Sequence, residues 1–446
     1  MRVAIIGGGI SGLALAYYLQ KLGISYDLFE GSAEVGGNIR TVNINGYLLE
    51  CGPNSLQMTD ELQEMISELK LETEVHPTIT VTNNRYVLCD GSYQKIPSCP
   101  FSLLRNGFLS GATKRRIVAE RKVPAAFIPY ETVTRFFERR FGADATEKII
   151  NPYITNLLGG DPDHLLIEKA LPEFKAFESK YGSVLRGLAK RQNGSGNKSF
   201  TFRGGMSTLP QAIADKLISL HTERKIEVIT RSMGKYILCS ATPHDMEDKE
   251  YDAVVLALPA HKAADLMDFT FPGISAALQN VNYPPLAVVH SIYNRHDVEH
   301  PLDGFGALHP KTEAPFSNGA VWVSSLFNGR CKPYEVLLTS YVGGTPYAAH
   351  ANLPEKELLE RVHEENQTNY AINAAPVFQH VTYWKKSMPQ YDLYIEDAHE
   401  MARMFEEANI FVAANWQGGV LVSDCIRHAK ELANKINLKA PLAQSA

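Results

Sequence analysis

The six residues GGGISG at positions 7–12 have the spacing of a loop that binds phosphate groups. Gly7 would allow a tight turn, Gly9 would let the backbone approach a pyrophosphate, and Gly12 would let the next helix pack against the strand. The free N–H groups at the start of that helix would hold the negative charge. The predicted cofactor contacts in this loop are Gly7, Gly8, Gly9, Ile10, Ser11 and Gly12. The chemistry expected here is dinucleotide binding.

Glu30 is the second chemical signal, because it ends the strand-like run ISYDLFE that follows the helical stretch LALAYYLQKLG. A carboxylate at this point accepts hydrogen bonds from ribose hydroxyls and disfavours a 2′-phosphate, so NADP is not expected. A purely structural strand–helix–strand unit could contain the same glycines. The order of strand, glycines, helix, strand and acid favours the dinucleotide site.

Arg85 is a charged residue within VTNNRYVLCDGSYQK, residues 81–95. This segment predicts a hairpin that turns at Asp90-Gly91 and returns toward Pro97. The local pattern alone indicates a solvated surface charge at the start of a strand. A guanidinium can also offer a planar fork to a carboxylate, and that alternative depends on the rest of the chain.

The length and composition of the whole chain limit the functions in which these residues can take part. Its 446 residues predict two or three packed units, and the net charge of −5 gives no reason to expect nucleic-acid binding. The six cysteines have no CxxC pair and no metal-ligand spacing, which favours reduced thiols and no metal site. We find no leader-like segment and no apolar run long enough to span a membrane, so a cytoplasmic location is expected.

Further strand-like runs at 251–257 and 410–414 are expected to join the first sheet, which predicts an α/β fold with a Rossmann-type domain built from discontinuous segments. This domain would comprise 1–78, 204–262 and 396–446. An antiparallel sheet is predicted from PLAVVHSIY, GAVWVSSLF, EVLLTSYVGG and VFQHVTYW, in a substrate domain of residues 79–85 and 263–395. Residues 86–203 are predicted to form a helical insert.

The continuation of the chain resembles the large FAD-dependent superfamily of amine-oxidase-like flavoproteins. The resemblance rests on GSAEVGGNIRT, GYLLECGPNS, FRGGM, KIEVI and AANWQGGVLVSDCI. It implies non-covalent FAD and further contacts from Gly36, Gly37, Asn38, Arg40, Gly52, Pro53, Asn54, Ser55, Val228, Asn415, Trp416, Gly419, Val420, Leu421 and Val422. No second glycine fingerprint for a nicotinamide is present. Electrons are therefore expected to come directly from the substrate and to pass to oxygen or a quinone.

Within that superfamily the chain is most similar to the protoporphyrinogen oxidase family, through NPYITNLLGGDPDHL, FTFRGGMSTLPQAI, PLDGFGAL, SYVGG and YWKKSMPQY. The resemblance implies six-electron oxidation of protoporphyrinogen IX, with hydride transfer to flavin N5 and hydrogen peroxide as the product of oxygen. It places Arg85 on a substrate propionate and Leu308, Trp322 and Tyr341 around the macrocycle. No catalytic acid or base is expected. Trp416, Trp322 and Tyr341 depart from the usual family residues.

Several alternatives remain open on the sequence. Coproporphyrinogen III, an amine or a carotenoid could be the substrate, and a flavin sensor without catalysis is a further alternative. Leu308 and Trp322 could be core residues, and Asn54 could cap a turn. The basic and apolar segment FSLLRNGFLSGATKRRIVAERKVPAAFIPYETVTRFFERRFG could pack on itself or bind a membrane surface. No motif sets the oligomeric state.

Overall fold

A five-stranded parallel sheet organises the first domain of the computed structural model, which describes all residues except 80–83, 97–106, 108, 193–198, 241–248 and 440–446. The strand order is β10-β2-β1-β14-β20. The strands are β1 (Arg2–Ile6), β2 (Ser25–Phe29), β10 (Leu220–His221), β14 (Ala253–Leu256) and β20 (Ile410–Val412). The predicted joining of distant segments is confirmed, since β14 lies between β1 and β20. The short strand β10 was not predicted.

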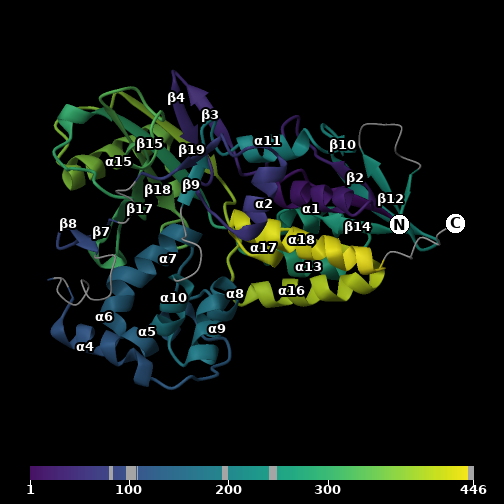
Figure 1. The fold of residues 1–446 in the computed structure, drawn as a ribbon, viewed down its shortest axis with the longest axis horizontal. Coiled ribbons are helices and arrows are strands. Elements are labelled where there is room, and N and C mark those ends of the chain that lie inside the picture. Colours follow the sequence, from purple (N-terminus) through teal and green to yellow (C-terminus); the bar gives the residue numbers. More distant parts are fainter. Residues whose placement is uncertain (80–83, 97–106, 108, 193–198, 241–248, 440–446) are drawn as a thin grey trace.

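Helices cover both faces of this sheet, because its central strands are apolar on both sides. On one face α1 (Ile10–Lys21) lies beside α18 (Val422–Lys439), so the two ends of the chain share one core (Figure 1). The helices on the other face are α12 (Ala260–Met267), α13 (Pro272–Gln279) and α16 (Tyr394–Phe405). The sheet therefore fixes the N-terminus of α1, where the predicted phosphate loop (residues 7–12) lies.

Small sheets and helices complete this domain. They are β3 (Thr41–Ile44) with β4 (Tyr47–Glu50), the set β5 (Leu56–Gln57), β9 (Ser199–Phe202) and β6 (Val75–Pro77), and the set β11 (Ile226–Ser232), β12 (Lys235–Ser240) and β13 (Glu250–Tyr251), with helices α2 (Asp60–Glu68), α11 (Thr208–Ala214) and α17 (Asn415–Gly418). Because β9 pairs with β5 and β6, residues 199–202 belong here and not to the helical insert.

The second domain is built on a seven-stranded sheet of order β19-β15-β18-β17-β16-β7-β8. Its strands are β7 (Arg85–Cys89), β8 (Ser92–Ile96), β15 (Leu286–Asn294), β16 (Gly306–Leu308), β17 (Gly319–Trp322), β18 (Glu335–Gly343) and β19 (Phe378–Trp384). Neighbouring strands of this sheet are antiparallel, except that β16 and β7 are parallel. The predicted strand GAVWVSSLF ends at Trp322, and α14 (Val323–Leu326) follows it. The helix α15 (Glu355–Tyr370) packs on this sheet.

The hairpin predicted around Arg85 is confirmed as β7 and β8. Its two turn residues Asp90 and Gly91 have φ of 51° and 70°, the left-handed values that a tight hairpin turn requires. Because β7 pairs with β16, the hairpin extends the large sheet. The predicted boundary at residue 86 is therefore wrong, and the helical insert begins beyond Ile96.

The helical unit lies below the large sheet in Figure 1. Its elements are α4 (Gly111–Ala119), η2 (Glu120–Lys122), α5 (Val133–Phe141), α6 (Ala143–Ala145), η3 (Thr146–Ile150), α7 (Asn151–Leu158), α8 (Ile167–Ala170), α9 (Pro172–Tyr181) and α10 (Val184–Gln192). Arg140 is fully buried in its core and pairs with Glu178 and Glu120 at 2.7 and 3.2 Å. No helix within the described ranges is both long and apolar enough to cross a membrane.

Candidate active site

The phosphate loop has a geometry that only glycine permits at two of its positions. Gly7 has φ of +113°, and a Cβ there would lie 2.3 Å from the carbonyl oxygen of Ala257. A Cβ on Gly12 would lie 2.0 Å from the carbonyl oxygen of Gly7. Gly9 has no heavy atom within 4 Å of its Cβ position, so this side of the loop is open. The loop is thus tight toward the sheet and accessible on the other side.

The N-terminus of α1 can receive an anion. No side chain caps it at Gly9, and its first turn contains no acidic residue. Beside it runs the second glycine pair, in which the Gly36 N–H donates to the Gly8 carbonyl over 2.8 Å. Gly37 follows with φ of +60°, and its Cβ position is 3.4 Å from the Gly9 Cα. Two segments that are far apart in the sequence therefore share one side of the loop.

The Glu30 carboxylate lies next to the loop. It accepts hydrogen bonds from the N–H groups of Gly8 and Ser32 over 2.7 and 2.8 Å. The Glu30 carbonyl accepts from the Arg224 N–H, which brings the residues before β11 to the same place. Val228, in β11, is half-buried and follows a bulge in that strand. The start of β11 is thus anchored at Glu30 through Arg224, and Val228 follows four residues later.

The segments 38–40 and 51–55 are held together by backbone contacts. The Cys51 N–H donates to the Arg40 carbonyl over 2.8 Å, and a Cβ on Gly52 would lie 2.1 Å from the Asn38 carbonyl oxygen. The Asn38 and Arg40 side chains are exposed. This packing directs the following residues Pro53, Asn54 and Ser55 toward the large sheet.

The C-terminal loop 415–419 is fixed by Tyr391. Its hydroxyl donates to the Asn415 carbonyl over 2.6 Å and accepts from the Gly419 N–H over 3.0 Å. Val420 and Val422 are partly buried at the start of α18, and the Leu421 side chain is 41 % exposed. The sequence indicated the motif SMPQY but not this role of Tyr391, because the contact joins residues that no local pattern relates.

The Trp416 side chain lies in the core and not at a cofactor surface. It is fully buried among the residues under α12 and α16, and its indole N–H donates to the Leu258 carbonyl over 3.0 Å. Its own carbonyl accepts from His399 over 2.6 Å. The Trp416 side chain is therefore part of the core, and the predicted cofactor contact of Trp416 could come only from its backbone.

Taken as a set, these features fit FAD. The open, uncapped glycine loop fits a pyrophosphate, Glu30 fits the adenosine ribose, and Gly37 leaves room beside Gly9. Asn54 adds a buried polar atom, since its Oδ1 has no hydrogen-bond partner within the described residues although the side chain is only 8 % exposed. A buried acceptor without a partner is costly unless a ligand satisfies it.

One face of the large sheet meets this cofactor region, and we call it the Tyr341 face. Leu308 pairs with Gly319, and Gly319 pairs with Tyr341, so these three residues lie in one row across the sheet. Arg85 lies on the same face, because Val87 pairs with Leu308 and side chains two residues apart point to the same side. Three of the four predicted substrate residues therefore share a face.

Tyr341 connects this face to the cofactor region. Asn54 donates a side-chain hydrogen bond to the Tyr341 hydroxyl, which joins segment 51–55 to β18. Burial raises the pKa of Tyr341 to about 12, so the hydroxyl keeps its proton at neutral pH. The hydrogen bond from Asn54 therefore fixes the position of the Tyr341 ring. Among the described residues, Asn54 is the only side chain of segment 51–55 that forms a hydrogen bond with β18.

Trp322 lies on the opposite face, so the prediction that it lines the same slot as Leu308 is wrong. The side chains of β17 alternate, and Trp322 points away from Gly319. It is fully buried, packs against Tyr86 with ring centroids 5.0 Å apart, and donates to the Tyr370 hydroxyl over 3.1 Å. Trp322 thus stabilises the core between the sheet and α15.

Arg85 is held by aromatic rings and not by an acid. Its guanidinium carbon lies 4.4 Å from the centre of the Phe305 ring and 5.8 Å from that of Tyr153 in α7. No carboxylate in the described part of the chain pairs with it, whereas the two buried arginines among the described residues, Arg140 and Arg330, both pair with glutamates. The partly exposed cation is therefore available to an anionic ligand.

The motifs SYVGG, SMPQY and NLLGGDP meet at one junction of the three units. The Thr345 N–H donates to the Gly159 carbonyl over 2.8 Å, and Gln390 Nε2 donates to the Leu158 carbonyl over 3.2 Å. The Leu166 N–H donates to the Tyr391 carbonyl over 2.8 Å. These contacts fix the end of α7 against the Tyr341 face, so the motifs set the orientation of the domains.

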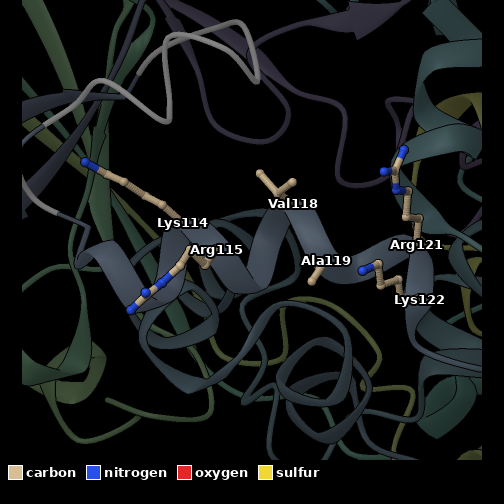
Figure 2. A pocket seen from close by; sticks show the side chains of 6 residues that line it. All are labelled: Lys114, Arg115, Val118, Ala119, Arg121 and Lys122. Carbon is tan, nitrogen blue, oxygen red and sulfur yellow. The ribbon is translucent and has the colours of Figure 1, made fainter.

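A basic hollow of about 310 Å³ lies on the surface of the helical unit, away from these features (Figure 2). It is lined by Lys114, Arg115, Val118, Ala119, Arg121 and Lys122. The Val118 side chain is 53 % exposed between these cations. Part of the segment whose membrane contact the sequence left open, residues 101–106 and 108, is outside the described residues.

Comparison with known proteins identifies relatives of the whole chain. Residues 10–437 match the family of flavin-containing amine oxidoreductases. The mitochondrial protoporphyrinogen oxidase of Nicotiana tabacum is 29 % identical over 95 % of this chain and 92 % of its own length. The coproporphyrinogen III oxidase of Bacillus subtilis (strain 168) is 28 % identical over 96 % of each chain.

Two solved structures have the same fold. A protein of Exiguobacterium sp. 255-15 with a provisional protoporphyrinogen oxidase name has a TM-score of 0.80 at 20 % identity, over 98 % of this chain and 99 % of its own. Cyclohexylamine oxidase of Brevibacterium oxydans IH-35A has a TM-score of 0.69 at 17 % identity, over 98 % and 99 %. The predicted fold class is confirmed.

Proposed function

We propose, from the premise that this chain belongs to the family of flavin-containing amine oxidoreductases, that it is an FAD-dependent oxidase whose substrate is protoporphyrinogen IX. The observation that carries the proposal is the Tyr341 face. It presents Arg85, a cation with no acid partner in the described part of the chain, on the same side of the sheet as the apolar Leu308 and the aromatic Tyr341. A flexible, apolar ring that carries carboxylates matches this combination.

The residues of the chain would bind and orient the ring. The Arg85 guanidinium would hold a propionate, since its charge and planar fork suit a carboxylate. Leu308 and Tyr341 would contact the apolar ring, and the Asn54 amide would lie where the ring meets the cofactor. When bound, FAD would accept electrons two at a time and pass them to oxygen or a quinone. Removal of six electrons and six protons from the porphyrinogen would then take three rounds.

Coproporphyrinogen III is the second candidate substrate, because the Bacillus subtilis relative is as similar as the plant enzymes. This substrate carries four propionates in place of two. Arg85 is the only lysine or arginine in β7, β16, β17 and β18, which supports the less charged ring. An enzyme for the more charged ring would gain from more cations on this face.

Anaerobic mixing of the FAD-loaded protein with each porphyrinogen tests the proposal. We expect protoporphyrinogen IX to bleach the flavin absorbance faster than coproporphyrinogen III at equal concentration. A faster reaction with coproporphyrinogen III would reverse the order of the two candidates. If neither ring reduces the flavin while an amine does, the porphyrinogen proposal is wrong.

We also propose peripheral contact with an anionic membrane surface from the cytoplasmic side. The cations around the hollow in Figure 2 and the side chains of Phe127 and Tyr130, which are 81 % and 65 % exposed, support it. Flotation with vesicles that contain anionic lipid should carry the protein upward, and neutral vesicles should not. Equal recovery in the bottom fraction with both vesicles would leave packing as the role of this unit.

A further inference from the structure

The helix α7 contributes a polar side chain to the Tyr341 face that the sequence did not indicate. The amide nitrogen of Asn156 lies only 2.9 Å from the position that a Cβ would occupy on Gly319. Gly319 itself lies in the row between Leu308 and Tyr341. Asn156 therefore reaches the sheet between the two side chains proposed to contact the substrate ring.

Gly319 leaves the space that Asn156 enters. Its φ is +138°, and a Cβ would lie 2.3 Å from the Ala307 carbonyl oxygen, so a side chain is excluded at this point of β17. The row thus has a gap between an apolar and an aromatic residue. An amide from another unit of the protein enters the gap.

The position of α7 is fixed from both sides of Asn156. Three residues earlier, the Tyr153 ring lies 5.8 Å from the Arg85 guanidinium carbon. Three residues later, the Gly159 carbonyl accepts from the Thr345 N–H. Because residues three apart lie on one side of a helix, Tyr153 and Asn156 both face the sheet. Asn156 is thus held beside the Tyr341 face by contacts on either side of it in α7.

The Asn156 amide has unused hydrogen-bonding capacity. The side chain is partly buried, and no hydrogen bond to its amide occurs among the described residues. An amide offers two donors and one acceptor, and a partly buried amide without partners gains from a ligand that supplies them. The neighbouring residues of the row, Leu308 and Gly319, have no side chain that can do so.

We propose that Asn156 is a substrate-recognition residue, whose side-chain oxygen accepts a hydrogen bond from a pyrrole N–H of the bound ring. The inference rests on the proposed function, because it requires a ring with inward N–H groups on the Tyr341 face. Asn156 would fix the rotation of the ring above Leu308, whereas Arg85 holds its carboxylate edge. The same amide would have no comparable partner in a linear carotenoid.

Substitution of Asn156 by leucine tests this role, because leucine keeps the branched shape of asparagine and removes its hydrogen-bonding groups. We measure the half-saturation concentration of protoporphyrinogen IX in anaerobic flavin reduction by the FAD-loaded protein, together with the melting temperature and the flavin content. We expect the half-saturation concentration to rise about tenfold, as for loss of one hydrogen bond in a partly buried site. Flavin content and melting temperature should stay unchanged.

Asn156→Ala is the second variant, since its smaller side chain cannot clash if leucine does, and the exposed Asn280→Leu is the matched control. An unchanged half-saturation concentration of protoporphyrinogen IX in both Asn156 variants overturns the proposal. A lower melting temperature with unchanged affinity also overturns it, because Asn156 would then only hold α7 on the sheet. If the wild-type protein binds no porphyrin and oxidises no porphyrinogen, the proposed function itself has failed.

Discussion

Replacement of Arg85 by glutamine should weaken substrate binding without slowing the reaction of the bound substrate. The substitution removes the charge and leaves a polar side chain of related length at the start of β7. The guanidinium has no acid partner among the described residues, so its loss leaves no buried carboxylate unpaired. The effect should therefore appear in binding and not in folding.

The structure also sets the size of this effect. A hydrogen bond to a charged group contributes about 1.5–3 kcal/mol, and the partial exposure of Arg85 favours the lower end. A loss of about 1.5 kcal/mol corresponds to about a tenfold rise in KM. The rings of Phe305 and Tyr153 pre-orient the guanidinium, so Arg85→Lys should recover only part of the affinity because the planar fork is lost.

The assay is anaerobic flavin reduction over a range of porphyrinogen concentrations, at low and high salt. We expect a higher half-saturation concentration in Arg85→Gln, an unchanged rate at saturation, and a weaker salt dependence than in the wild type. Equal half-saturation and equal salt dependence in both proteins would refute the reasoning and return Arg85 to a solvated surface charge. A large loss of the saturated rate alone would show that Arg85 acts on the electron transfer.

Three further predictions follow from single contacts. Tyr341→Phe should lower the melting temperature and leave KM unchanged, because Asn54 loses a hydrogen-bond partner while the ring remains; a raised KM would assign the hydroxyl to the substrate. Gly12→Ala should yield protein without flavin absorbance, whereas Gly111→Ala, with open space at its Cβ, should stay yellow; a yellow Gly12→Ala would contradict the tight turn. Burial lowers the pKa of His290 to about 3, with His380 a smaller cause. As the pH falls, His290 is therefore protonated in the unfolded chain before it is protonated in the folded protein, which favours unfolding. The contribution of neutral His290 to stability is thus complete above about pH 6.5 and is lost as the pH falls toward 3. The melting temperature should fall less between pH 7 and pH 4 in His290→Gln than in the wild type. An equal fall in both proteins would exclude His290 as a cause of the acid sensitivity.

Short-range patterns determined much of this protein from the sequence. The spacing of Gly7, Gly9 and Gly12 predicted the phosphate loop, and the pair Asp90-Gly91 predicted the hairpin turn, because each depends on the backbone freedom of a few neighbouring residues. The apolar runs around β14 and β20 predicted buried parallel strands, because a strand covered on both faces is apolar along its whole length. The resemblance of the motifs added the family, which the match over residues 10–437 confirms.

Only the tertiary structure decided which of these residues meet. Side chains alternate along a strand, so the pairing register put Leu308 and Tyr341 on one face and Trp322 on the other. The bond between Asn54 and Tyr341, the support of the C-terminal loop by Tyr391, and the approach of Asn156 to Gly319 each join distant segments. Such contacts depend on the packing of whole domains, and no local spacing encodes that packing.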